Sequence, residues 1–145
     1  MRLSIVYSRF LLEPLPHLGL WRTPNQTILM ELNDQEYLVI RHHFYSDLAS
    51  VPNWAWPLLE CTPNHLSIAG MTHDYLSRRD ALIHHVTAPP LPVTFDRSLT
   101  IFNDVMEQHG SISGSDRWKI ISAVKAHRHT YWQKRDVAWR PEELR

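Results

Sequence analysis

The hydrophobic pattern of this chain changes its period once, from strand-like in the first third to helix-like in the remainder. Residues 27–32 and 36–40 are short apolar runs separated by Asn33-Asp34-Gln35, which tolerate positive φ, so they predict a β-hairpin. Leu3 to Tyr7 predict a further strand. Beyond Pro52, apolar residues recur at spacings of three and four. The pattern predicts an α+β fold, in which a small antiparallel sheet with a hairpin near 27–40 packs against three to four helices.

The first predicted helix carries the most unusual polar residues. Thr62 followed by Pro63 predicts its start, with a hydroxyl N-cap and a proline at the first helical position. Asp74 is expected at the edge of the inward stripe and Tyr75 on the opposite side. The inward stripe is Leu66, Ala69, Gly70, His73 and Leu76. We expect this stripe to face the next long helix, because sequential helices are usually neighbours.

Two more helices are expected after an irregular connection. Residues 80–94, which include His84 and His85, carry three prolines and predict a long loop. One helix is expected from an N-cap at Asp96 to His109, with Gly110 as its C-cap. Its buried residues are Leu99, Phe102, Val105 and Met106.

The last helix is expected from near Ser115 to about Arg135. Arg128 interrupts its apolar stripe, so this side chain either extends outward or meets a buried carboxylate. The stripe is Trp118, Ile121, Val124, Arg128, Tyr131 and Trp132.

Length and charge limit the class of protein. A chain of 145 residues favours one domain, expected over 1–135, followed by a polar and loosely held tail over 136–145. Basic and acidic residues both number 15, so nucleic acid is a poor default partner. No apolar run is long enough for a membrane span, and we expect a soluble protein. Cys61 is the only cysteine, which excludes an internal disulfide and favours a reducing compartment.

Four ionisable or hydroxyl residues stand in segments that otherwise resemble core. Asp47 and Ser50 lie in an apolar run that ends at Pro52, and His73 and Asp74 lie on the first helix. Such groups are costly to bury unless they are partnered or used. As a catalytic site, His73 would act as general base, with Asp74 and Asp47 as orienting groups or ligands of a divalent metal and Ser50 beside them. The alternative is a buried polar network of Asp47, Ser50 and His73 that includes Arg128.

The motifs around these residues resemble the bacteriophage and prophage family called domain of unknown function 1353. The resemblance covers about residues 28 to 125 and implies a phage setting, without an established reaction. The residues that carry it are Phe44, Ser46–Pro52, His73–Leu76, Ile101–Phe102, Val105–Met106, Gly110, Trp118 and Ala123–Val124. Two positions depart from the family pattern. Leu99 stands where the family often has an acid, and His43 where it tends to have glycine.

Two functions follow as hypotheses. The first is a phage or prophage accessory or virion-associated protein, in the host cytoplasm or the virion, that binds a phage or host protein through Trp54, Trp56 and Trp139. The second is a small cytoplasmic hydrolase. Its His-Asp pair is similar to that of secreted phospholipase A2, whose disulfides and calcium loop are absent here. With His42 or His43 and Asp104, it is similar to the HD-type phosphohydrolases, which are wholly helical. The missing acid at Leu99 favours the first hypothesis.

Overall fold

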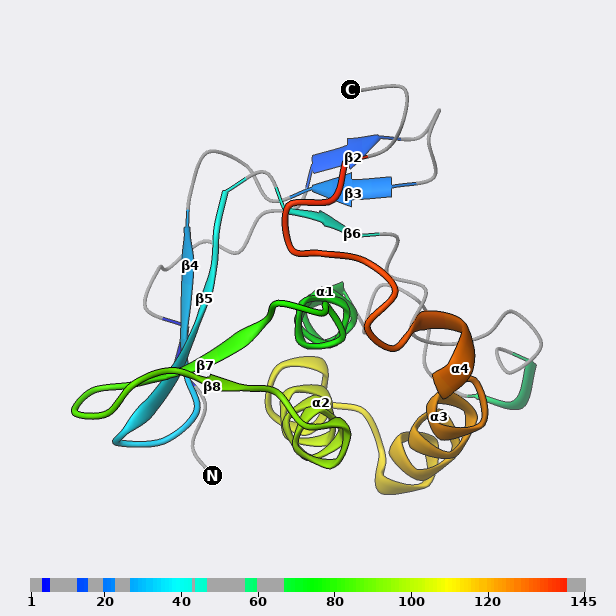
Figure 1. Cartoon of the computed structure of the whole chain (residues 1–145). Helices are drawn as coiled ribbons and strands as arrows, with labels where there is room; N and C mark the ends of the chain where they lie inside the picture. Colours follow the sequence, from blue (N-terminus) through cyan, green and yellow to red (C-terminus); the bar gives the residue numbers. More distant parts are fainter. Residues whose placement is uncertain are drawn as a thin grey trace.

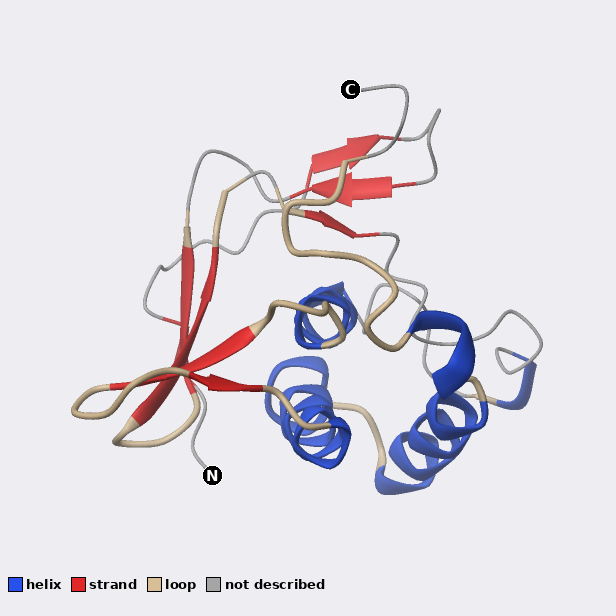
Figure 2. Cartoon of the chain, in the orientation of Figure 1, coloured by secondary structure: helices blue, strands red, loops and turns tan. Residues whose placement is uncertain are grey.

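The strands of the main sheet lie on one side of the molecule and the helices on the other (Figure 2). The structure is a computed structural model that describes residues 4–5, 13–15, 20–22, 27–42, 44–46, 57–59 and 67–140. Its small antiparallel sheet and four described helices confirm the α+β prediction.

Eight strands form two antiparallel sheets among the described residues. The main sheet has the order β1-β4-β5-β7-β8, and the smaller one has the order β2-β3-β6. The strands are β1 (Ser4–Ile5), β2 (Glu13–Leu15), β3 (Leu20–Arg22), β4 (Ile28–Glu31), β5 (Glu36–Ile40), β6 (Tyr45–Ser46), β7 (Leu82–His85) and β8 (Leu91–Pro92). The strand predicted near residues 3–7 is therefore present as β1.

The predicted hairpin is confirmed as β4 and β5. Met30 pairs with Leu38, and both side chains are buried on the inward face of the sheet. The turn closes through the Asn33 side chain, whose Oδ1 accepts hydrogen bonds from the backbone N–H groups of Gln35 and Glu36, both at 2.9 Å. Positive φ is not used here, because among the described non-glycine residues only Ser111 and Gln133 adopt it.

The prediction of a long loop over residues 80–94 is wrong. This segment forms β7 and β8, and β7 extends the main sheet by pairing Tyr37 of β5 with His84. The prolines do not prevent this because Pro89 and Pro90 fall in the connection between the strands, and Pro92 lies on the last strand in the sheet order.

The four helices are α1 (Ser67–Leu76), α2 (Phe95–Gly110), α3 (Gly114–Ala126) and α4 (Arg128–Tyr131). The stripe predicted for α2 is buried as expected. Its N-cap is Thr94 rather than Asp96, since the Thr94 side chain accepts from the backbone N–H of Arg97. At the other end Gly110 is still helical, and Ser111 takes the left-handed conformation instead.

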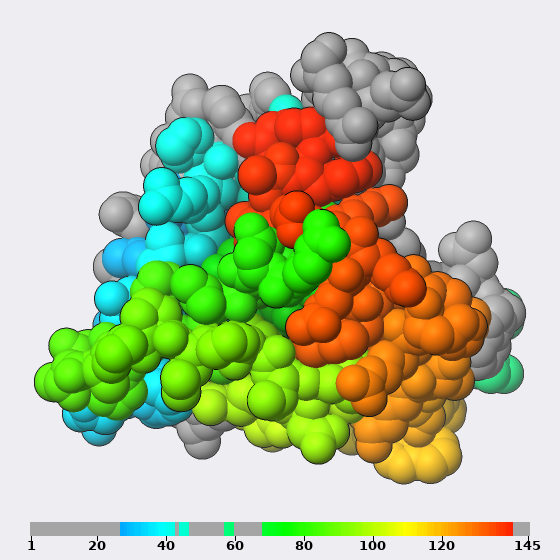
Figure 3. Space-filling model, viewed as in Figure 1, coloured from blue at the N-terminus to red at the C-terminus, as the bar shows by residue number. Residues whose placement is uncertain are grey.

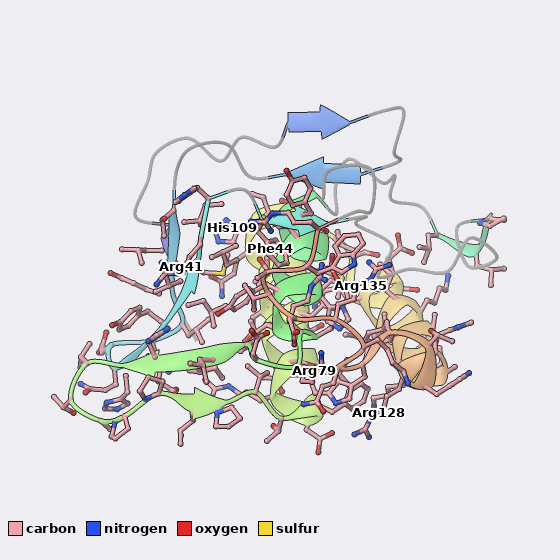
Figure 4. All side chains as sticks on the ribbon, turned by 45° about the horizontal axis from the view of Figure 1, so that its top comes forward. Arg41, Phe44, Arg79, His109, Arg128 and Arg135 are labelled. Carbon is pink, nitrogen blue, oxygen red and sulfur yellow. The ribbon has the colours of Figure 1, made fainter. Side chains whose placement is uncertain are left out.

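The single last helix predicted over 115–135 is also wrong. α3 ends at Ala126, and His127 has φ −100° and ψ 10° before the short α4 begins. α3 buries Asp116, Ile120, Ala123 and Val124, so Trp118 falls on the opposite face of the helix and is 72% exposed. Arg128 is exposed as well, and its guanidinium lies 4.2 Å over the ring of Phe95. Figure 4 shows Arg128 at the margin of the molecule.

α1 is the central helix, with α2 on one side and the strands on another (Figure 1). Ala69, His73 and Leu76 are buried as predicted, whereas Leu66 is outside the described residues. Tyr75 was expected to face away, but it is buried. The reason is that the strand side of α1 is also covered, by Phe44 and the β7 backbone.

Candidate functional site

His73 lies in the core, between aromatic rings from two other helices. Its imidazole stacks on Phe102 of α2, with ring centroids 4.4 Å apart and an interplanar angle of 25°. Tyr131 of α4 meets the same imidazole edge-on at 5.4 Å. The prediction that the first helix turns His73 toward the next long helix is confirmed.

Burial sets the charge of His73. The side chain is 1% exposed, and burial lowers the pKa of its imidazole from the ordinary 6.5 to about 3. Burial also raises the pKa of the neighbouring Tyr131 phenol, so that group stays protonated. At neutral pH, His73 is therefore an uncharged ring packed among rings. A general base must reach the proton that it removes, and this imidazole does not meet solvent.

Asp74 pairs with Arg78, one helical turn later in the chain. Arg78 Nη2 donates to Asp74 Oδ2 at 3.1 Å, and the Asp74 side chain is 19% exposed. The same Nη2 donates to the backbone carbonyl of Tyr45 at 2.8 Å. Since Tyr45 belongs to β6, the pair connects the end of α1 to the smaller sheet.

Arg78 is buried beneath aromatic side chains. Its guanidinium lies 5.0 Å from the ring centroid of Phe44 and 5.5 Å from that of Trp139. Phe44 also meets Tyr75 edge-on at 5.8 Å, toward the middle of the molecule in Figure 4. Arg78 was not predicted from the sequence, although its spacing of four from Asp74 is the spacing of helical ion pairs.

Residues 133–140, here termed the C-terminal strap, cross the end of α1. The strap is the red segment that passes between α4 and the smaller sheet in Figure 1. Gln133 donates its backbone N–H to the carbonyl of Ser77 at 2.8 Å. Arg79 donates its backbone N–H to the carbonyl of Arg135 at 2.9 Å. These two bonds pair the strap with the chain that leaves α1.

Side chains fasten the strap further along. Arg79 Nε donates to Asp136 Oδ1 at 2.8 Å, and Asp80 Oδ1 accepts from the backbone N–H of Val137 at 2.7 Å. The Arg135 guanidinium lies 4.0 Å over the ring of Trp139. A loosely held tail was expected from residue 136, but residues 136–140 are attached to the domain by these contacts.

Several predicted site residues fall outside the described part of the chain. Asp47 and Ser50 are among them, so their place beside His73 stays a prediction. The same holds for Trp54 and Trp56. Trp139 is described, and it serves within the molecule as the cover of Arg78.

The described residues offer little for a metal site. Among them, no group of three or more histidine, cysteine, aspartate or glutamate side chains could hold a metal ion. His42 and Asp104 are both described and belong to no such group, while His43 lies outside. The described site stabilises a buried charge. The guanidinium of Arg78 pairs with Asp74, donates to the Tyr45 carbonyl and is covered by the rings of Phe44 and Trp139.

The fold and motif define a small α+β protein whose His-Asp pair lies on the central helix, with His73 in the core. The chain belongs to the family DUF1353, protein of unknown function, whose sequence model matches residues 25–124. This confirms the family predicted from the motifs, and the matched residues stop before the C-terminal strap. No curated protein and no solved structure matches the chain. In the described part, no helix is long and apolar enough to cross a membrane.

Proposed function

We propose that this protein acts by binding another protein, as an accessory or virion-associated component of a bacteriophage or prophage, and that its His-Asp motif maintains the fold. The observation that carries the proposal is the aromatic packing of His73 between Phe102 and Tyr131. A hydrolase needs a base that reaches water, and His73 is buried, with a pKa lowered to about 3 that makes it a weak base.

An exposed tryptophan supports the binding role. Trp118 stands 72% exposed on α3, and Leu58, 61% exposed, is joined to the same helix because Lys119 Nζ donates to its carbonyl at 3.1 Å. Tryptophan is enriched among the residues that dominate protein interfaces. The partner is a phage or host protein, and Trp118 is the first contact to test.

The experiment separates fold maintenance from catalysis by comparing His73→Phe with His73→Ala. Phenylalanine fills the space between Phe102 and Tyr131 but cannot accept a proton. Alanine leaves a cavity there and is expected to cost about 2 to 4 kcal/mol. Both variants are assayed by thermal melting and by complementation of a phage or prophage that lacks the gene.

We expect His73→Phe to melt at a temperature close to that of the wild type and to complement. Trp118→Ala should also melt normally, but it should fail to complement. Leu91→Ser, which changes another exposed apolar residue, is the matched control and should complement. A folded His73→Phe variant that fails while Trp118→Ala complements would instead favour the hydrolase.

A further inference from the structure

A depression of about 360 Å³ lies beside the end of α1 on the outward face of the main sheet. Leu38 and Ile40 of β5 point into the core, so the alternate residues of that strand face the depression. Its lining residues are Tyr37, Val39, Arg41, Tyr75, Asp80, Leu82, His84 and Val137. Figure 3 shows β5 in cyan, the residues after α1 in green and the strap in red meeting on one face. This depression is termed the sheet-face pocket.

One side of the sheet-face pocket is aromatic and apolar. Tyr37 and His84 are cross-strand partners, and their rings stack with centroids 5.3 Å apart and an interplanar angle of 20°. Val39, Leu82 and Val137 add aliphatic surface from two strands and the strap. Such a surface suits a ligand with a flat apolar face.

The polar groups of the sheet-face pocket are few and of opposite charge. The Tyr75 hydroxyl lies 3.5 Å from both the backbone N and O of Leu82. Burial raises the pKa of Tyr75, the nearby Asp80 carboxylate raises it further, and Arg41 lowers it. Asp80 and Arg41 line the same pocket as this phenol, and their charges cancel.

We propose that the sheet-face pocket binds a neutral sugar, either a single pyranose or the end of a short oligosaccharide. A pyranose has a flat face of C–H groups for the aromatic side, and hydroxyls that both donate and accept hydrogen bonds. Asp80 accepts and Arg41 donates. The cancelled charge disfavours a phosphate or a metal ion, and 360 Å³ is at the small end of ligand pockets.

The strap completes this site. Because Asp80 Oδ1 accepts from the Val137 backbone at 2.7 Å, the strap fixes the carboxylate at the rim of the sheet-face pocket. Val137 itself supplies part of the lining. The sugar site goes beyond the proposed protein binding and depends on neither Trp118 nor His73.

The test titrates maltose, lactose and the N-acetylglucosamine disaccharide into the full chain labelled with ¹⁵N. At least one sugar should shift the amide resonances of Tyr37, His84 and Val137. Tyr37→Ala, Asp80→Asn and Arg41→Gln should each weaken its affinity about tenfold. Leu91→Ser, on β8 outside the lining, should leave the affinity unchanged.

Melting curves identify any variant that fails to fold, and Arg41 and Asp80 are exposed positions where substitution is tolerated best. The proposal is overturned if none of the three sugars shifts these amides. It is equally overturned if the folded variants bind as tightly as the wild type, or if a glycyl-tyrosine dipeptide shifts the same amides and the sugars do not.

Discussion

Single residues of the His-Asp motif occupy opposite environments although they are adjacent in the chain. His73 is held as a neutral ring among Phe102 and Tyr131, while Asp74 forms an ion pair with Arg78. The two do different structural work: one fills the space between helices, and the other neutralises a buried cation. Adjacent ionisable groups are a common signal of an active site, but here they also satisfy two separate packing needs.

The lowered pKa of His73 makes stability depend on pH. Below about pH 6.5 the unfolded imidazole takes up a proton, whereas the folded one does not until its pKa of about 3. The unfolded state therefore binds more protons than the folded state in this window. The contribution of His73 to the free energy of unfolding falls as the pH falls. Between about pH 7 and pH 5 the wild type should lose about 2 kcal/mol through this group alone.

Urea unfolding at both pH values, on the wild type and His73→Phe, measures this loss. Subtracting the change in the variant removes the contribution of the carboxylates. Equal pH dependence of the two proteins would show that His73 is not buried as a neutral ring.

Arg78 carries the buried charge, so its replacement should cost more than that of Asp74. Arg78→Ala leaves the Tyr45 carbonyl and the Asp74 carboxylate without this donor and should cost about 2 to 3 kcal/mol, less than a fully buried pair because Asp74 reaches solvent. Arg78→Lys should recover only part of the stability that Arg78→Ala loses, since an ammonium lacks the planar surface that stacks on Phe44 and Trp139. Asp74→Asn should have the smallest effect.

Chemical denaturation of these three variants gives the order directly. If Arg78→Lys is as stable as the wild type, the aromatic cover contributes nothing measurable.

At the scale of elements, the C-terminal strap is held by one aromatic residue and several exposed polar bonds. Trp139→Ala removes the ring between Arg78 and Arg135, so it should release the strap without unfolding the helices. The backbone amides of Gln133 and Arg79 should then exchange hydrogen faster, because their bonds bind the strap to the end of α1.

Hydrogen exchange followed by mass spectrometry checks this prediction. Asp136→Asn is the matched control for Trp139→Ala, because it weakens only the exposed ion pair with Arg79. It should accelerate the exchange of these amides less than Trp139→Ala does. Unchanged protection of both amides in Trp139→Ala would mean that the backbone pairing holds the strap alone.

Elements with a strong local pattern could be predicted, and those that depend on distant partners could not. The hairpin and α2 have their own apolar periodicity, so both were found. β7 was missed because it becomes a strand only by pairing with β5, through contacts such as Tyr37 with His84. The break at His127 has no proline or glycine to mark it, so one helix was predicted in place of α3 and α4.

At the scale of the whole molecule, an ion pair joins the sheet to the helices. Arg97 of α2 donates to Glu36 of β5 through Nη2 at 2.9 Å and Nη1 at 3.4 Å, and Asn33 donates to the same carboxylate at 2.8 Å. Arg97 and Asn33 lower the pKa of Glu36 by these hydrogen bonds. The residues are 61 positions apart in sequence, so the pair could not be predicted from a local pattern.

A double-mutant cycle tests this link between the layers. Glu36→Gln and Arg97→Gln should each destabilise slightly, and their coupling should be about 1 kcal/mol, because the pair is bidentate but partly exposed. Denaturation of the two single variants and the double variant measures the coupling. A coupling near zero would leave apolar packing as the main connection between sheet and helices.

The candidate site divides in the same way between predictable and unpredictable parts. The inward position of His73 follows from helical spacing and is confirmed. Arg78 was missed because it lies beyond the end of α1, where periodicity gives no face, and its partners Phe44 and Trp139 come from distant segments. A buried arginine is identified only when the chain segments that cover it are known.

The order of the chain also matters while the protein is being made. Asp136 follows its partner Arg79 by 57 residues, and Trp139 follows Arg78 at a similar distance. At synthesis rates of about 5 to 20 residues per second, the ribosome needs roughly 3 to 11 s to reach the strap after α1 is complete. During that interval the guanidinium of Arg78 lacks its Trp139 cover, so α1 cannot complete its packing until the strap has emerged from the ribosome.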